Sequence, residues 1–274
     1  MSIMLFLRQI WLFSQVELSR LWLTRRGLMT LAATAVIWFV LLRYAIAPAS
    51  EIMQEPNFQK TLTAAFGMLG LHQLLNWPAP ELTLYWMLSL ILLPLLSLVF
   101  TANQLSSDAA RGTLRFISLR SSRSAIVLGR FCGQLLVQLC LIVLSLAATL
   151  TLSSLRLGAI DWQAIEAALL ISCNLLIVLM PFTALMAVFS AWARSSRLAL
   201  SLAIVSLGLT FGLLSWLIHH QPAASFLLQY MPGAQIWQLI PTQGWQSLQL
   251  AVVPLAQTAV LLLIAQQILS RRAL

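Results

Sequence analysis

Charged residues are scarce in this sequence of 274 amino acids. Only 8% of the residues are charged, against about 25% in an ordinary soluble domain, while 60% are hydrophobic. A soluble fold of this size could not cover its surface with so few charges. The hydrophobic residues stand in long continuous blocks, and several blocks reach the roughly 20 residues that a helix needs to cross a bilayer. Because the blocks are continuous rather than alternating, they predict transmembrane helices and not a barrel.

The sequence also lacks the motifs of common catalytic and metal sites. It contains no GxxxxGK[ST] phosphate loop, no HExxH, no GxSxG and no pair of carboxylates within one predicted span. None of its three cysteines belongs to a CxxC pair. His219 and His220 would point apart on a helix, and no third metal ligand is evident. We therefore expect no catalytic residue, no metal site and no cofactor in this chain, and no enzymatic activity of its own.

Ionisable residues are nearly absent from the centres of the predicted spans. This absence counts against an ion-coupled carrier, which relays charge through acidic side chains within the membrane. It suits an apolar or amphipathic substrate better than a small ion. Uncharged polar side chains do occur there, and they could line a translocation path or simply join helices by hydrogen bonds. The candidates for the path are Gln134, Gln138, Asn174 and Thr183.

Six hydrophobic blocks are long enough to span the membrane, and they cover residues 28–47, 82–102, 131–152, 164–189, 198–218 and 248–269. Most of the 16 basic residues lie at one set of block ends, and most of the seven acidic residues lie at the other. Since basic loops stay in the cytoplasm, both termini are predicted to be cytoplasmic. The net charge of +9 then reflects topology. It does not indicate nucleic-acid binding, because the basic residues form no stripe with interleaved aromatic residues.

Three segments outside the spans have distinct predictions. Residues 1–27 are apolar but interrupted by Glu17 and Arg20, which would be costly at the bilayer centre, so a helix lying in the inner interface is expected before the transmembrane domain of residues 28–274. On the outer side, the apolar piece 62–75 is too short to span and could lie along the interface. The outer segment 219–247 consists of apolar pieces broken by proline, a pattern typical of interfacial or re-entrant helices.

Two stretches of the sequence resemble a known family. The first reads Val16-Glu17-Leu18, then Arg20, then Thr24-Arg25-Arg26-Gly27 before the first span. The second reads Asp108-Ala109-Ala110-Arg111-Gly112-Thr113-Leu114, then Arg123-Ser124-Ala125-Ile126, then Gly129-Arg130-Phe131 before the third span. Together with the six-span plan, these stretches resemble the ABC-2 type permeases, the membrane subunits of many bacterial ABC exporters. The family usually has glutamate where Asp108 stands, and often a proline before the second arginine stretch, which is missing here.

The resemblance implies that the inner segment 103–130 carries a coupling helix that docks on a separate ATPase subunit. The residues expected at this interface are Asp108, Arg111, Gly112, Thr113, Arg115 and Arg123. The arginines suit an acidic partner surface, but they also suit anionic lipid or topology alone. Residues 1–27 would be the connecting helix.

The resemblance further implies partners and a location. It implies two ATPase subunits that bind ATP and magnesium, a second permease subunit in a homodimer or heterodimer, and the bacterial cytoplasmic membrane. The predicted function is therefore transport, with export favoured, driven by ATP hydrolysed in the partner. Two alternatives stay open: a scaffold that transmits conformational change to an outer partner protein without moving a solute, and an ion-coupled carrier.

Overall fold

The computed structural model describes residues 3–53, 55, 77–158, 161–240, 242 and 244–271. Within these residues all regular structure is helical, and six helices are long and apolar enough to cross a membrane. The prediction of an all-α membrane protein with six spanning helices is therefore confirmed. Which side of the membrane the termini face stays a prediction, and the apolar piece 62–75 lies outside the described residues.

The helices follow the predicted order with longer bounds. The first half of the chain contains α1 (Ile3–Leu23), α2 (Arg25–Leu41), the π-helical turn η1 (Leu42–Ile46), α3 (Ala47–Met53) and α5 (Pro80–Thr101). The middle contains α6 (Ser106–Ala110), α7 (Thr113–Arg120), α8 (Arg123–Leu157) and α9 (Trp162–Trp192). The remainder contains α10 (Ser196–His220), the 3₁₀ helix η4 (Pro222–Tyr230), α11 (Ile236–Leu239), the 3₁₀ helix η5 (Gly244–Ala251) and α12 (Val252–Arg271). Segment 103–130 therefore contains α6, α7 and the first turns of α8.

Local side-chain chemistry sets where the long helices begin and end. The side chains of Thr24, Ser122, Asp161 and Ser195 each accept a hydrogen bond from a backbone N–H in the first turn of α2, α8, α9 and α10. These caps satisfy donors that a helix leaves unpaired at its N-terminus. Gly158 ends α8 with φ of 73°, a left-handed conformation that glycine adopts without steric cost. The caps therefore mark where four of the long helices begin, and Gly158 marks where α8 ends.

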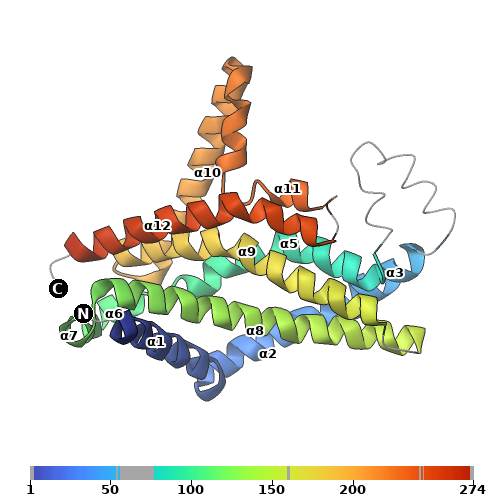
Figure 1. Ribbon diagram of the computed structural model, residues 1–274, viewed down its shortest axis with the longest axis horizontal. Coiled ribbons are helices and arrows are strands. Elements are labelled where there is room, and N and C mark those ends of the chain that lie inside the picture. Colours follow the sequence, from blue (N-terminus) through green and yellow to red (C-terminus); the bar gives the residue numbers. More distant parts are fainter. Residues whose placement is uncertain are drawn as a thin grey trace.

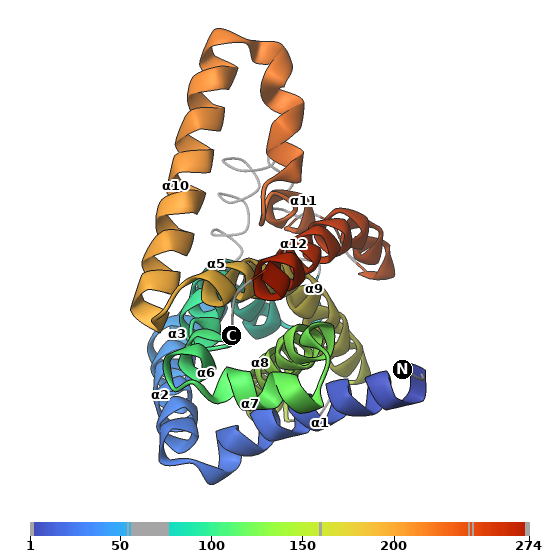
Figure 2. The same cartoon turned by 90° about the vertical axis from the view of Figure 1, so that its left-hand side faces the viewer.

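Five of the long helices form a bundle with α9 near its centre (Figure 1). The central α9 packs against α5, α8 and α12, and it is the most buried of the six candidate spans. Both termini lie at the same end of the bundle as α6 and α7 (Figure 1). The view from that end shows α1 running obliquely along one edge of the bundle, with α7 beside it (Figure 2). We call this the arginine-rich end.

The sixth long helix, α10, stands apart from the others. It rises from the side of the bundle and η4 returns beside it, so the two form an arm (Figures 1 and 2). Only 17% of the most apolar stretch of α10 is buried, and large apolar side chains such as Leu209, Leu213 and Trp216 are exposed. The arm therefore presents an apolar surface that lipid or another protein chain can cover.

The bundle core is an apolar cluster centred on α5, α8 and α9. Its largest fully buried side chains include Tyr85 and Trp86 of α5. Trp38 of α2 stacks on Tyr85 with ring centroids 4.7 Å apart, and the Tyr85 hydroxyl lies 2.8 Å from the Ser145 hydroxyl of α8. A buried tyrosine generally needs such a partner for its hydroxyl. Tyr85 therefore links α5 to both α2 and α8.

Candidate functional site

The two helices at the arginine-rich end, α1 and α8, approach each other at a pair of glycines. Gly129 and Gly133 are four residues apart and lie on one face of α8. A Cβ atom on Gly129 would stand 2.6 Å from the Cβ of Phe13, and one on Gly133 would stand 2.7 Å from the Cβ of Glu17. Small residues at this spacing let helix backbones pack closely in membranes. The Ser14 hydroxyl adds a hydrogen bond of 3.1 Å to the carbonyl of Gly129.

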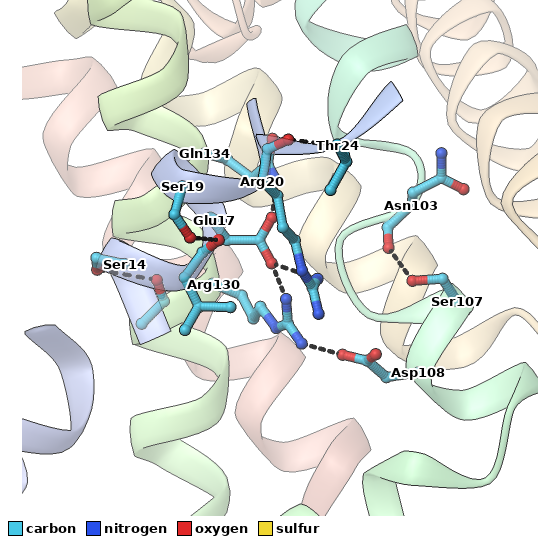
Figure 3. Close-up of polar contacts among 12 residues, drawn as sticks. Ser14, Glu17, Ser19, Arg20, Thr24, Asn103, Ser107, Asp108, Arg130 and Gln134 are labelled. Carbon is cyan, nitrogen blue, oxygen red and sulfur yellow. Dashed lines mark hydrogen bonds and ion pairs between the residues drawn. The ribbon is translucent and has the colours of Figure 1, made fainter. Parts of the chain in front are cut away.

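The close packing brings a buried ion network together. The guanidinium of Arg130 on α8 forms ion pairs with the carboxylates of Glu17 on α1 and Asp108 on α6 (Figure 3). Glu17 also accepts hydrogen bonds from the Arg20 guanidinium and the Gln134 side-chain amide, both at 3.0 Å. Figure 3 shows the Glu17 carboxylate between the two arginines, with Arg130 reaching on to Asp108. One arginine thus joins three helices.

Burial makes this network energetically demanding. Arg130 is 3% exposed, and the side chains of Glu17 and Asp108 are nearly as buried. Removing charges from water costs several kcal/mol per ion, which is offset only when the partners and hydrogen bonds are all in place. The three helices are therefore held in one relative position by groups that cannot separate without exposing a buried charge. Such an arrangement suits a junction that transmits a rigid-body movement.

The loop between α6 and α7 is closed by local contacts. Gly112 has φ of 70°, and it connects the two short helices in a left-handed turn. The Thr113 hydroxyl lies 3.2 Å from the Asp108 carbonyl and 3.4 Å from its carboxylate. The short helices therefore form one hairpin, and Asp108 links this hairpin to Arg130.

The residues predicted to contact an ATPase are found in three different settings. Arg111, Gly112 and Arg115 are exposed, and Thr113 is half-buried. Asp108 is buried in the ion network. Arg123 donates a hydrogen bond of 2.9 Å to the Leu269 carbonyl at the end of α12, where a cation is favoured by the helix dipole. The interface assigned to these residues stays a prediction, but only the exposed ones are placed to touch a partner without rearrangement.

One face of α7 carries apolar residues that the sequence reasoning did not single out. Phe116 is 71% exposed and Leu119 is 80% exposed, three residues apart and next to Arg115. The opposite face packs inward through Leu114 and Ile117. Phe116 and Leu119 are not needed to pack α7 against the bundle. The sequence of α7 already contains more apolar residues than one buried helix face requires. We call Arg115, Phe116 and Leu119 of α7, together with Arg111 in the turn before it, the α7 face.

The four polar residues proposed for a translocation path all make hydrogen bonds between elements. Gln138 of α8 donates to the Ser97 hydroxyl of α5 at 2.9 Å and to the Thr183 hydroxyl of α9 at 3.1 Å. Asn174 of α9 donates to the Ser247 hydroxyl of η5 at 2.7 Å, and Gln134 donates to Glu17. These contacts give each residue a role in joining helices. That they also line a path stays a prediction.

Removing the shared hydroxyl of the Gln138 cluster is expected to destabilise the bundle. We expect Thr183→Val to lower the free energy of unfolding by about 1 kcal/mol, because the buried Gln138 amide loses a partner while the side-chain volume is kept. Thermal unfolding in detergent measures this. Thr151→Val on α8 is the control, because its exposed hydroxyl contacts only its own helix. Equal effects of the two substitutions would show that the cluster contributes nothing to stability.

The sequence reasoning also missed the centre of the ion network. Both Glu17 and Arg130 belong to the stretches that resemble the ABC-2 type permeases, and Glu17 also argues against a seventh span, but neither pattern predicted that the two side chains would pair. The glycine pair four residues apart was a visible signal for close helix packing, and Arg130 directly follows Gly129. Glu17 lies on a different helix, so the sequence did not show that it would meet this pair. Among the described residues, no group of three histidine, cysteine, aspartate or glutamate side chains could hold a metal ion.

Comparison with known proteins identifies the family. The family model described as "ABC-2 family transporter protein" matches residues 22–271, which is nearly the whole chain. No curated protein matches the chain. Members of the family are generally non-catalytic membrane subunits that work with an ABC ATPase subunit. With six helices that can span a membrane and a match over almost its full length, the chain belongs to the ABC-2 family of transporter proteins and is a multi-pass membrane permease of an ABC transporter.

Proposed function

We propose that the chain exports its substrate using ATP hydrolysed by a separate ATPase subunit, which docks on the α7 face. The observation that carries this proposal is the α7 face itself. Phe116 and Leu119 are strongly exposed beside Arg111 and Arg115, at the end of the bundle where both termini lie. Exposed apolar residues rimmed by arginines are typical of protein interfaces. The arginines would pair with carboxylates of the ATPase by charge-assisted hydrogen bonds.

The ion network supplies a route from the ATPase to the spanning helices. A movement of the ATPase would push on α7 and α6, which form one hairpin. Asp108 ties that hairpin to Arg130 on α8, and Arg130 ties α8 to Glu17 on α1. Because the three helices share one buried guanidinium, they are expected to move as a unit. Helix α8 continues from this junction to Leu157. It would therefore transmit the displacement to the opposite end of the bundle.

The remaining partners follow from the resemblance and from exposed surface. We propose two ATPase subunits that bind ATP and magnesium, and a second permease subunit, identical or related. The exposed apolar residues of α10 supply a surface that membrane lipid or the second subunit would cover. The bacterial cytoplasmic membrane is the proposed location, and this chain itself is proposed to be non-catalytic. The parts of α8 and α9 around Gln138 and Thr183, residues 131–152 and 167–192, contain no charged residue, which supports an apolar or amphipathic substrate.

Copurification tests the docking surface. The tagged protein is purified in mild detergent, and the bound ATPase is identified by its vanadate-sensitive ATP hydrolysis and by peptide mass. Phe116→Ala combined with Leu119→Ala is expected to weaken ATPase binding about tenfold, because interface energy concentrates in a few large side chains. Leu155→Ala is the control, since Leu155 is 84% exposed at the other end of α8.

Two results would contradict the proposal. One is the absence of any ATPase from the purified wild-type protein under every gentle condition. The other is full ATPase binding by the Phe116→Ala, Leu119→Ala variant, which would place the interface elsewhere. Because Asp108 and Arg123 make structural contacts within the chain, they are left unchanged in this test.

A further inference from the structure

A second candidate site lies at the opposite end of the bundle from the ion network. A cavity of about 310 Å³ opens between the start of α9, the residues before α5 and the start of η5. This volume falls at the lower end of the range for small-molecule pockets. Its walls include Trp77, Gln163, Glu166 and Trp245. The cavity thus has two indole rings and one carboxylate in its walls.

The carboxylate is the only charge in the described lining. No arginine, lysine or histidine lines the cavity in the described part of the chain, and Glu166 has no ion-pair partner among those residues. The nearby Arg156 is already paired with Glu81, at 2.7 Å. Asp161 accepts a hydrogen bond of 3.0 Å from the backbone of Gln163, which satisfies the positive end of the α9 dipole. Among the described residues, the negative charge of Glu166 is therefore uncompensated.

The carboxylate and one indole are joined in a defined geometry. The Trp245 indole N–H donates a hydrogen bond of 3.0 Å to a Glu166 carboxylate oxygen. The ring's positive edge is thus used by Glu166, and its π face, which is negative, stays available to a cation. The second carboxylate oxygen also stays available. Together they make a combined electrostatic and cation–π binding surface.

Contacts behind the cavity hold both indoles in place. The Ser247 hydroxyl accepts from Asn174 of α9, which fastens η5 to α9 two residues after Trp245. Trp77 packs against Trp86, which is buried in the core, with ring centroids 6.3 Å apart. The backbone that carries each indole is therefore tied to the bundle. This reduces the entropy cost of ordering the two rings when a ligand binds.

From this arrangement we propose that the cavity binds an alkylammonium group, with Glu166 neutralising its charge and the Trp245 ring contacting its alkyl groups. Aromatic rings beside a carboxylate are the chemistry that recognises quaternary ammonium ions. A hard metal ion is a poor alternative, because calcium requires six to eight oxygen ligands, and the lining offers far fewer. An anion would be repelled by Glu166, and a neutral apolar molecule would gain nothing from its charge. The site does not depend on the ATPase.

Binding of choline to the purified full-length protein tests the proposal. The protein is placed in nanodiscs of phosphatidylglycerol and titrated with choline, and calorimetry and tryptophan fluorescence report binding. The matched ligand is 3,3-dimethylbutan-1-ol, which has the shape of choline without its charge. We expect saturable choline binding and at least about tenfold weaker binding of the alcohol, because the cation contributes both the ion pair and the cation–π contact.

Variants distinguish this cavity from other sites on the protein. Glu166→Gln keeps the acceptor for the Trp245 N–H but removes the charge, and Trp245→Leu removes the ring. Each is expected to weaken choline binding by about threefold to tenfold. Trp162→Leu and Glu51→Gln are the controls, because Trp162 is 76% exposed outside the cavity lining and Glu51 is an exposed acid on α3. Both controls should bind choline as the wild type does.

The alkylammonium group could belong to a soluble cation or to a phosphatidylcholine headgroup. Repeating the titration in nanodiscs of a second lipid composition distinguishes these two sources. In nanodiscs of phosphatidylcholine, competition that lowers the apparent affinity for choline indicates that the headgroup enters the cavity. Unchanged affinity indicates a soluble cation. The proposal is overturned if choline shows no saturable binding in either membrane. It is equally overturned if Glu166→Gln and Trp245→Leu both bind choline like the two controls.

Discussion

Replacing Arg130 by methionine is expected to destabilise the protein more than any other single substitution at the arginine-rich end. The change leaves the carboxylates of Glu17 and Asp108 buried without the guanidinium that joins them. Removing one partner from a buried ion pair typically costs about 3–5 kcal/mol, because the remaining charge is uncompensated. Methionine keeps much of the side-chain volume, so a cavity contributes little. Thermal unfolding of the purified protein in detergent measures the effect.

A neighbouring arginine provides the matched control for this experiment. Arg20 contacts the same Glu17 carboxylate at 3.0 Å, but its side chain is 46% exposed. An exposed ion pair contributes only about 0–1 kcal/mol, so Arg20→Met should shift the unfolding temperature much less. Equal destabilisation by Arg130→Met and Arg20→Met would show that burial of Arg130 does not govern the stability of this end.

A triple substitution distinguishes two effects of changing Arg130. One is that the Glu17 and Asp108 carboxylates are left without a partner, and the other is that the ion network itself is lost. Glu17→Gln and Asp108→Asn together with Arg130→Met remove all three charges, so no buried charge is left without its partner. We expect this triple variant to recover most of the stability lost by Arg130→Met alone. If the network also transmits movement, as the proposed function requires, the recovered protein should still couple ATP hydrolysis to transport poorly. Recovery of both stability and coupling would show that the network serves only structure.

The spans were predictable from the sequence because each depends on local composition. A helix crosses a bilayer by its own length and hydrophobicity, and all six predicted blocks correspond to long apolar helices. The bounds differ mainly where polar residues extend a helix, as in α8, which begins at Arg123 behind its Ser122 cap. Hydropathy does not report that extension, whereas the capping residue does.

The candidate site was less predictable because it depends on contacts between distant parts of the chain. Glu17, Asp108 and Arg130 come from three helices, and their meeting depends on how α1 and α6 pack against α8. Composition alone indicates that an unpaired Glu17 carboxylate has a high free energy in the membrane. It does not indicate that a partner residue lowers that free energy. The Trp245–Glu166 contact is similar, since 79 residues separate the two side chains. Only tertiary packing joins such residues.

Introducing leucine at Gly133 is expected to separate α1 from α8. A Cβ at this position would stand 2.7 Å from the Glu17 Cβ and 3.1 Å from the Ser14 Cα. These atoms belong to or adjoin the α1 backbone, so no side-chain rotation relieves the clash and the helix must move. Overpacking of this kind costs about 1–3 kcal/mol, and displacing Glu17 from Arg130 adds the cost of a disturbed buried pair. Thermal unfolding and ATPase coupling should therefore both decline, with Gly133→Ala intermediate.

The chain contains its own control for this substitution. Gly208 and Gly212 on α10 repeat the spacing of Gly129 and Gly133, but a Cβ at either α10 position meets no atom within 4 Å. Gly212→Leu should therefore leave stability unchanged or raise it slightly, because leucine favours the helix by about 1 kcal/mol relative to glycine. If Gly133→Leu behaves like Gly212→Leu, then α1 does not need close contact with α8. The ion network would then have to form at a longer helix separation than the glycine pair implies, and its role as a rigid junction would fail with it.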